Sequence, residues 1–499
     1  MIGTHDVPPA RLASGVKGID TILGGGFLCG GLYIIQGPPG VGKTTLGNQI
    51  CFNHAASGGK ALYVTLLAEY HARLMQHLGI MTFFDASRIP DQISYLNGLR
   101  VLQDEGLKGL LGLVRREIGK RGGDILVLDG IVSAQRAAAD EQTFNEFIHA
   151  LQAVAIATSC TVFLLTSAQG TKVSPEHTMV DGIIELVDQL VGWSAESSLQ
   201  VIKLRGSSFL RGRHAFKITN DGVVVHPRIE ALLARPSRPD PGGTRRVPSG
   251  IDQLDVMLEG GLPGASTTMV MGPSGVGKTT LGLQFLSKST EAEPGLLFGF
   301  YETPVRLDAK IAGVCPALGD LIEKGIVEVL WQPPTDDLLD AYGERLLQAV
   351  HRRKVTRLFI DGLGAFQDAS NSEPGRIGNF LTALMNEMRV FGVTTVYTLE
   401  VPDIMGPSIR TPLGDLSNLA ENLVLLRFIE LRSRLYRLIS ILKVRDSQFD
   451  ATLHEYVTSG QGLLIDVASD SAERITAGYA RQEQDGPIPD HQPRSRSGE

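Results

Sequence analysis

Cysteine is sparse in this chain, and its spacing suits neither metal binding nor redox chemistry. The four cysteines lie far apart, and none forms a C-x-x-C pair. Without closely spaced thiols, the sequence supports neither a zinc site nor a dithiol motif. We therefore expect four small, buried, apolar residues of a protein kept in a reducing compartment, namely Cys29, Cys51, Cys160 and Cys315.

Excess positive charge and long apolar runs are also lacking. The 499 residues carry a formal net charge of −7, so nothing suggests a polyanion-binding surface. No apolar run approaches the roughly 18 residues that a membrane span requires. The start of the chain lacks the basic segment and apolar stretch of a secretory signal. These absences predict a soluble, cytoplasmic protein without a membrane partner.

The chain does have two copies of one phosphate-binding loop. Residues 37–45 and 272–280 both satisfy G-x-x-x-x-G-K-[ST] and end in a second threonine. Glycines in this pattern let backbone N–H groups turn inward around phosphate oxygens, at the positive end of the following helix. The predicted nucleotide-binding residues are Gly37, Gly40, Val41, Gly42, Lys43, Thr44 and Thr45 in the first loop, and Gly272, Gly275, Val276, Gly277, Lys278, Thr279 and Thr280 in the second.

The repeat extends beyond the loops. A Ser-Gly and Gly-Ile-Asp opening, an apolar strand ending in Asp-Gly, and a Lys-x-Arg triplet recur in the same order around each loop. Such spacing indicates a duplicated domain rather than a short-period solenoid. The segment between the two copies is rich in proline and glycine, which predicts a linker. The polar segment at the end of the sequence is predicted to be a disordered tail. The predicted organisation is a leader at 1–10, domains at 11–232 and 244–466, a linker at 233–243 and a tail at 467–499.

Each half alternates short apolar strands with amphipathic helices. This pattern predicts an α/β fold of two tandem phosphate-loop domains, each a mainly parallel sheet flanked by helices. One helix carries Phe144, Phe147, Ile148, Leu151 and Val154 on a single face, and its counterpart is expected within 377–388. We expect the strands that end at Asp129 and Asp361 to neighbour the loop strands.

The loops and these aspartates together predict sites for ATP and Mg²⁺. Lys43 and Lys278 would reach the β- and γ-phosphates. The metal ligands would be the hydroxyls of Thr44 and Thr279 and, through water, the carboxylates of Asp129 and Asp361. The alternative is that each aspartate only caps the helix that follows.

Hydrolysis or phosphoryl transfer also needs a carboxylate that positions or deprotonates the attacking oxygen. Glu302, just after an apolar strand, is the candidate in the second domain. In the first domain Glu69 is nearby but displaced, and a surface-helix carboxylate is the alternative interpretation. The two sites are therefore not equivalent.

Two cations at alternate positions close each repeat. Lys203 with Arg205, and Lys443 with Arg445, come too late in their domains to act as loop lysines. They suit projection into a neighbouring subunit's nucleotide, where they would stabilise γ-phosphate charge as an arginine finger does. The alternative is a solvated basic pair.

Outside the leader and tail, the chain resembles double-domain KaiC-like ATPases of the RecA superfamily. The resemblance rests on the Ser-Gly-x-x-Gly-Ile-Asp opening, both loops, Phe-Tyr-Glu-Thr-Pro at 300–304, and the segments at 202–207 and 441–447. It implies ATP-bound hexameric rings with nucleotide at subunit interfaces. In the family's clock protein, the second ring transfers the γ-phosphate to a Ser–Thr pair on the neighbour.

The chain departs from the family pattern at three places. The family's Glu-Glu pair is Tyr301-Glu302 in the second domain, and Leu67-Ala68 followed by Glu69 in the first. The phosphorylated Ser–Thr pair aligns with Ser417-Asn418, so Ser417 is the phosphosite that the resemblance implies. The alternative is that Ser417 is an ordinary serine at a helix start or in a loop. A two-site phosphorylation cycle could not run unchanged.

Three functions remain open from the sequence. The leading hypothesis is an ATP-hydrolysing hexamer with serine/threonine autokinase activity in signalling or timing, whose protein partners the sequence does not name. A RecA-like DNA recombinase or motor shares the nucleotide core, but we find no cation cluster with interleaved aromatics. A nucleotide-gated scaffold with little turnover is the third, and the displaced Glu69 favours it for the first ring.

Overall fold

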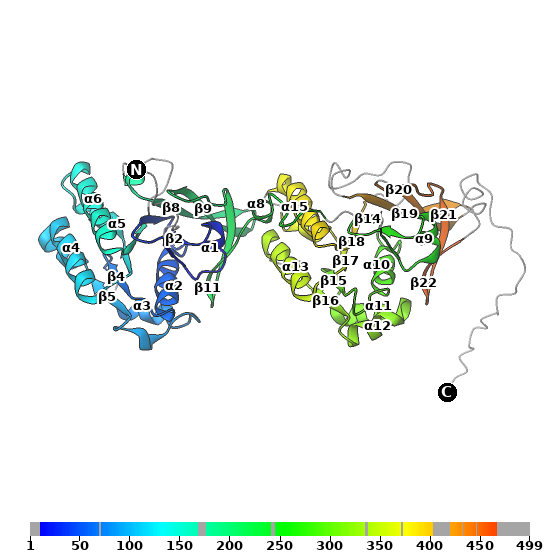
Figure 1. The fold of residues 1–499 in the computed structure, drawn as a ribbon, viewed down its shortest axis with the longest axis horizontal. Helices are drawn as coiled ribbons and strands as arrows, with labels where there is room; N and C mark the ends of the chain where they lie inside the picture. The colour runs from blue at the N-terminus through cyan, green and yellow to red at the C-terminus, as the bar shows by residue number, and fades with distance from the viewer. Residues whose placement is uncertain are drawn as a thin grey trace, which may run out of the picture. The chain divides into compact units, whose positions relative to one another are not determined.

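The computed structural model divides into two compact units. One comprises Met1–Arg235 with Leu338–Glu344, and the other Pro236–Asp337 with Arg345–Glu499. Figure 1 shows the elements of each unit along the chain. The structure describes residues 10–68, 71–167, 176–240, 245–334, 338–370, 373–402, 420–431, 433–445 and 447–466.

The first half of the chain alternates strands and helices up to β7 and then continues mainly as strands. The elements are β1 (Arg11–Leu12), α1 (Ile19–Ile22), β2 (Phe27–Leu28), β3 (Leu32–Gln36), α2 (Lys43–Ala56), β4 (Ala61–Thr65), α3 (His71–Leu78), β5 (Ile93–Asn97), α4 (Leu99–Arg121), β6 (Ile125–Asp129), α5 (Ile131–Ala137), α6 (Glu141–Thr158), β7 (Thr161–Thr166), α7 (Glu176–Met179), β8 (Gly182–Val191), β9 (Ser194–Leu204), β10 (Arg213–Thr219), β11 (Gly222–His226) and α8 (Ile229–Leu232).

The second half repeats this order with small changes. Its elements are β12 (Arg246–Val247), α9 (Asp252–Met257), β13 (Leu262–Pro263), β14 (Thr267–Gly272), α10 (Lys278–Leu286), β15 (Gly295–Gly299), α11 (Pro304–Val314), α12 (Pro316–Glu323), β16 (Val327–Trp331), α13 (Leu339–Arg353), β17 (Arg357–Asp361), α14 (Gly364–Asp368), α15 (Ile377–Val390), β18 (Thr394–Glu400), β19 (Asn422–Leu431), β20 (Arg434–Lys443), β21 (His454–Ser459) and β22 (Gly462–Ile465).

Each half builds a nine-stranded sheet with the same topology. The strand order is β11-β10-β9-β8-β3-β7-β6-β4-β5 in the first and β22-β21-β20-β19-β14-β18-β17-β15-β16 in the second. The six strands from β8 to β5, and their six counterparts, pair in parallel, whereas the remaining strands pair antiparallel. The predicted fold class is confirmed: these are two tandem RecA-like α/β domains.

One prediction about strand order was wrong. The strand ending at Asp129 does not neighbour the loop strand, because β7 pairs with both β3 and β6 and lies between them. In the second domain β18 likewise lies between β14 and β17. The chain leaves β6, crosses one face of the sheet in α5 and α6, and returns as the inserted strand. All these strands are parallel, so their carboxyl ends still meet at one edge.

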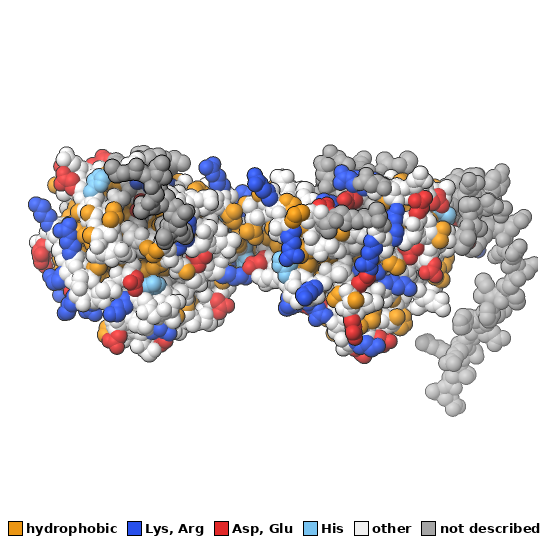
Figure 2. All heavy atoms as spheres, viewed as in Figure 1, with side chains coloured by type: hydrophobic (Ala, Val, Ile, Leu, Met, Phe, Trp, Pro, Cys, Tyr) orange, Lys and Arg blue, Asp and Glu red, His pale blue; other side chains and the backbone are white. Residues whose placement is uncertain are grey.

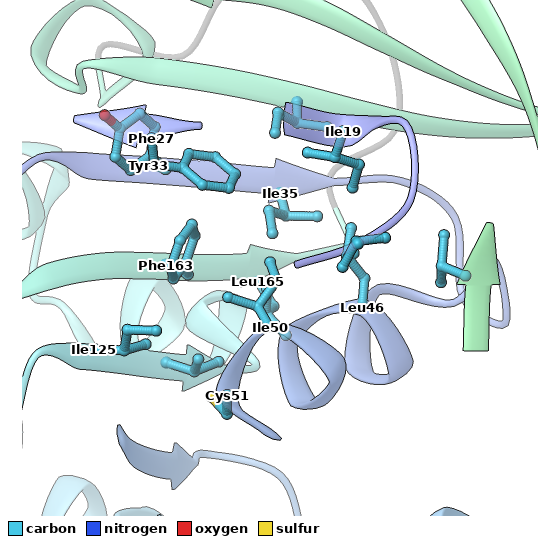
Figure 3. Packing of buried hydrophobic residues seen from close by; sticks show 14 of the residues in the cluster. Ile19, Phe27, Tyr33, Ile35, Leu46, Ile50, Cys51, Ile125, Phe163 and Leu165 are labelled. Carbon is cyan, nitrogen blue, oxygen red and sulfur yellow. The ribbon is translucent and has the colours of Figure 1, made fainter. Parts of the chain in front are cut away.

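Helices cover both faces of the first sheet, and successive strand residues divide between two cores. On β6, Ile125 and Val127 belong to the core beneath α2, whereas Leu126 and Leu128 belong to the core beneath α4 and α6. Figure 3 shows the first of these cores, where Ile50 of α2 lies beside Leu165 of β7. Burial on both faces explains why the parallel strands are continuously apolar.

The amphipathic helices form as the sequence predicts. The five predicted apolar residues of α6 are all buried, and Asp140 caps the helix by accepting from the backbone N–H of Thr143 at 2.7 Å. Ile377, Phe380, Leu381, Leu384 and Met388 are likewise buried on α15.

The cysteine prediction was only partly right. Cys51, Cys160 and Cys315 are buried, whereas Cys29 is exposed in the turn between β2 and β3. At the surface, Lys and Arg side chains are interspersed with Asp and Glu on the face drawn in Figure 2. Among the described residues, no helix is long and apolar enough to cross a membrane.

Candidate nucleotide sites

Both loops follow the central strand of a sheet and open directly into a helix. β3 ends at Gln36 and α2 begins at Lys43, and β14 and α10 flank the second loop in the same way. Thr45 and Thr280 lie in the first turns of the two helices, and Val41 and Val276 are buried. The first turn of a helix leaves backbone N–H groups free to bind an anion.

Glycine is required in these loops for two separate reasons. Gly42 and Gly277 have φ of 100° and 113°, a left-handed conformation that residues with a side chain rarely adopt. A Cβ on Gly37 or Gly272 would lie 2.3 Å from Leu186 O or 2.5 Å from Leu426 O, respectively. The adjoining strand therefore leaves no space for a side chain at the start of either loop.

Each loop threonine contacts the strand-end aspartate of its own domain. Thr44 Oγ1 donates to Asp129 Oδ2 at 2.9 Å, and Thr279 Oγ1 donates to Asp361 Oδ2 at 2.9 Å. Burial raises the pKa of Asp361, although the hydroxyls of Thr398 and Thr279 oppose the shift. The hydroxyl and carboxylate that the sequence proposed as metal ligands thus lie side by side in both domains.

The two loop lysines lie over their own loops. Lys43 Nζ donates to the carbonyls of Gly37 and Pro38 at 2.8 and 2.7 Å. Lys278 Nζ makes the same bonds, at the same distances, to Gly272 and Pro273. Burial lowers the pKa of each lysine, and nearby carboxylates oppose the shift.

Glu302 lies in the short connection between β15 and α11, at the same edge of the sheet as the second loop, although β17 and β18 lie between β15 and the loop strand. Its Oε1 is paired with Lys310, the seventh residue of α11. Its Oε2 is buried and has no hydrogen-bond partner among the described residues. Trp331 Nε1 donates to the carbonyl of Phe300 at 3.1 Å, which fixes the backbone just before this connection. The carboxylate is therefore held through one oxygen, and its other oxygen has no partner in the described part of the chain.

The first domain has no carboxylate at the matching position. Asp129 pairs in register with Thr65, and Asp361 with Gly299, so counting forward places Ala68 where the second domain has Glu302. Ala68 is exposed. The other candidate, Glu69, lies outside the described residues.

The two Lys-x-Arg triplets lie at the opposite edge of their sheets from the loops. Lys203 Nζ and an Arg205 guanidinium nitrogen both donate to the carbonyl of Thr178, at 3.0 and 2.6 Å. Lys443 Nζ donates to the carbonyl of Ala420 at 3.0 Å. β9 and β20 run antiparallel to the strands beside them, so both triplets end near the amino ends of β8 and β19. Neither triplet can reach the nucleotide site of its own domain.

Sequence reasoning missed two contacts in the second site. Tyr456 OH donates to the carbonyl of Val276 at 2.6 Å and ties the loop to β21. Glu400, the last residue of β18, lies with Oε2 3.8 Å from Lys278 Nζ. Both contacts join segments distant in sequence, and no motif marks them. The proposed phosphosite Ser417 lies outside the described residues.

Comparison with known proteins assigns the chain to a family. The family model described as "ATPase: KaiC" matches twice, at residues 12–230 and 247–470. The chain belongs to the KaiC ATPase family.

Curated relatives of this KaiC-family chain match over nearly its whole length. The "Circadian clock oscillator protein KaiC" of Picosynechococcus sp. is 24% identical, covering 93% of this chain and 91% of that protein. The protein of that name from Parathermosynechococcus lividus is 23% identical, covering 93% and 87%. "Circadian clock oscillator protein KaiC 1" of Synechocystis sp. is 23% identical, covering 94% and 91%.

Proposed function

We propose that this KaiC-family chain is an ATP-binding and ATP-hydrolysing ring protein with serine/threonine autokinase activity in its second domain. The observation that supports it best is the second-domain site, where Glu302 has one oxygen paired with Lys310 and a buried second oxygen without a partner among the described residues, and where its charge acts on Asp361, the hydrogen-bond partner of Thr279. The name of the relatives, "Circadian clock oscillator protein", favours a role in timing. We take 11–232 and 244–466 as the two ATPase domains.

The donor atoms suit Mg²⁺ bound together with nucleotide phosphates. Mg²⁺ prefers oxygen ligands and usually keeps several waters beside one or two protein ligands. The Thr279 hydroxyl and the Asp361 carboxylate provide such oxygens, as do Thr44 and Asp129. Among the described residues no group of three or more His, Cys, Asp or Glu forms a metal site, so the phosphates would complete the coordination. The metal would neutralise phosphate charge.

Side chains of this chain would bind the phosphates and deprotonate the attacking oxygen. Lys278 exchanges its bonds to the loop carbonyls for the β- and γ-phosphates, and the loop N–H groups bind the same oxygens. Oε2 of Glu302 accepts the proton of a water or a serine hydroxyl while the oxygen of that water or serine attacks the γ-phosphorus. The bond from the γ-phosphorus to the oxygen that bridges it to the β-phosphate breaks, and ADP leaves. With Ala68 at the matching position, we propose that the first domain binds ATP chiefly as a structural ligand.

Ring assembly should depend on nucleotide. The finger cations lie far from their own loops, so a complete site requires a neighbouring subunit. A ligand shared by two subunits stabilises the assembled state, and head-to-tail contacts that close give a ring. We expect a hexamer at saturating Mg²⁺-ATP and smaller species without nucleotide, measured by light scattering. A monomer at saturating ATP would overturn the ring.

Autophosphorylation should occur on Ser417. A serine hydroxyl in line with the γ-phosphate and near Glu302 would be the acceptor. We expect wild-type protein incubated with Mg²⁺-[γ-³²P]ATP to carry label on Ser417, read by phosphopeptide mapping. Ser417→Ala should lose the label but keep ATP binding, and mixing it with Glu302→Gln subunits should restore some labelling in trans. If the wild-type protein carries no phosphate on Ser417, the autokinase proposal is wrong and only the proposed ATPase activity stands.

A further inference from the structure

The second nucleotide site contains a carboxylate, Glu400, that the proposed mechanism does not use. It ends β18, the strand inserted between the loop strand β14 and the Asp361 strand β17. Glu400 pairs in register with Gly272, the first residue of the loop, and Val401 N donates to Gly272 O at 3.2 Å. The carboxylate is therefore placed at the start of the loop by the sheet itself.

The same strand contacts both working parts of the site. Thr398 Oγ1 donates to Asp361 Oδ1 at 2.8 Å, two residues before Glu400. Residues two apart on a strand face the same side, so Thr398 and Glu400 point in the same direction. Glu400 Oε2 lies 3.8 Å from Lys278 Nζ. One strand thus presents a hydroxyl to the aspartate and a carboxylate to the lysine.

The two partners of this ion pair differ in burial. The Lys278 side chain is only 11% exposed, whereas the Glu400 side chain is 64% exposed. An ion pair with one such exposed partner is weak, and its carboxylate can turn into solvent at little cost. Lys278 also bonds to two loop carbonyls, whereas the described contacts of Glu400 include no other ion pair. The pair can therefore open without disturbing the loop.

We propose that Glu400 is a specificity-determining residue of the second site. Its carboxylate competes with the terminal phosphate of a nucleoside triphosphate for the Lys278 ammonium. The inference rests on the proposed binding of ATP, but not on hydrolysis or kinase activity. A carboxylate beside the γ-phosphate repels it, and the lysine exchanges one anion for the other on binding. ATP affinity is lowered more than ADP affinity, because ADP lacks the phosphate that competes with Glu400.

The first domain provides a natural comparison. Its inserted strand β7 pairs Thr166 with Gln36, so the next residue, Ser167, matches Glu400 beside the loop. Ser167 is exposed and uncharged. On this proposal the two sites differ in their preference for ATP over ADP, and exchanging the two residues exchanges the preference.

The test measures binding of ATP and ADP to the full chain at low ionic strength with Mg²⁺. Lys43→Ala weakens nucleotide binding at the first loop, so the second site can be titrated by calorimetry. Glu400→Gln in this background should bind ATP roughly threefold to tenfold more tightly, with a smaller change for ADP. The gain should shrink at high salt, since exposed charges are screened.

A reciprocal variant and a conservative variant complete the test. In a Lys278→Ala background, Ser167→Glu should weaken ATP binding at the first site, and Glu400→Asp should lie between wild type and Glu400→Gln. Equal or weaker ATP binding by Glu400→Gln, or equal gains for ATP and ADP, overturns the proposal. Failure of the wild-type chain to bind ATP would instead overturn the proposed function.

Discussion

Glu302→Gln is expected to reduce ATP turnover in the second domain by roughly 10²-fold or more, the usual scale for a lost general base. In the proposed mechanism Oε2 of Glu302, which has no partner among the described residues, accepts the proton, and an amide at this position could not. Binding should persist, because Lys278 and the loop N–H groups are unchanged. Turnover is measured as phosphate release in a Lys43→Ala background, where the first loop is disabled.

Two further variants make this result specific. Asp308→Asn removes an exposed carboxylate from the same helix, α11, and should leave turnover unchanged. Lys278→Ala should weaken nucleotide binding as well as turnover, because its ammonium lies over the loop. Unchanged hydrolysis in Glu302→Gln would show that the base is another group.

The loops and their aspartates could be predicted from sequence because their requirements are local. Gly42 and Gly277 need a left-handed backbone, and Gly37 and Gly272 lie too close to a neighbouring strand for a side chain. Such positions accept few residue types, so the pattern repeats visibly in both halves. The buried faces of α6 and α15 could also be predicted from the sequence, because an amphipathic helix buries its apolar residues.

Strand order and register could not be predicted in this way. An apolar strand such as β6 reads the same whether it lies beside the loop strand or one strand away, and only pairing across the sheet shows that β7 intervenes. Strand register also shows that Ala68 matches Glu302 in position and that Glu400 lies beside Gly272. These contacts depend on residues far apart in sequence, which no short motif records.

Arg445→Ala is expected to lower second-domain turnover by roughly 10²- to 10³-fold, and the loss should be reversible in trans. Lys443 pairs in register with Leu423 of β19, and Leu423 pairs with Met269 of the loop strand. Because β20 runs away from the loop at this point, Arg445 lies on the order of 15 Å from the loop, measured along the strands. The Arg445 side chain is 61% exposed and lies 3.9 Å from Glu421. Arg389 lies closer to the same carboxylate, at 3.1 Å, so Arg445 remains available to a neighbouring subunit.

The decisive measurement mixes two inactive variants. Arg445→Ala subunits keep the loop and Glu302, and Glu302→Gln subunits keep the finger, so an interface that joins them contains one complete site. Phosphate release in the mixture should exceed that of either variant alone. The double variant Glu302→Gln with Arg445→Ala, assembled at the same concentration, gives the baseline from the first domain. A mixture whose rate equals the average of its parts would show that Arg445 does not act on a neighbour's nucleotide.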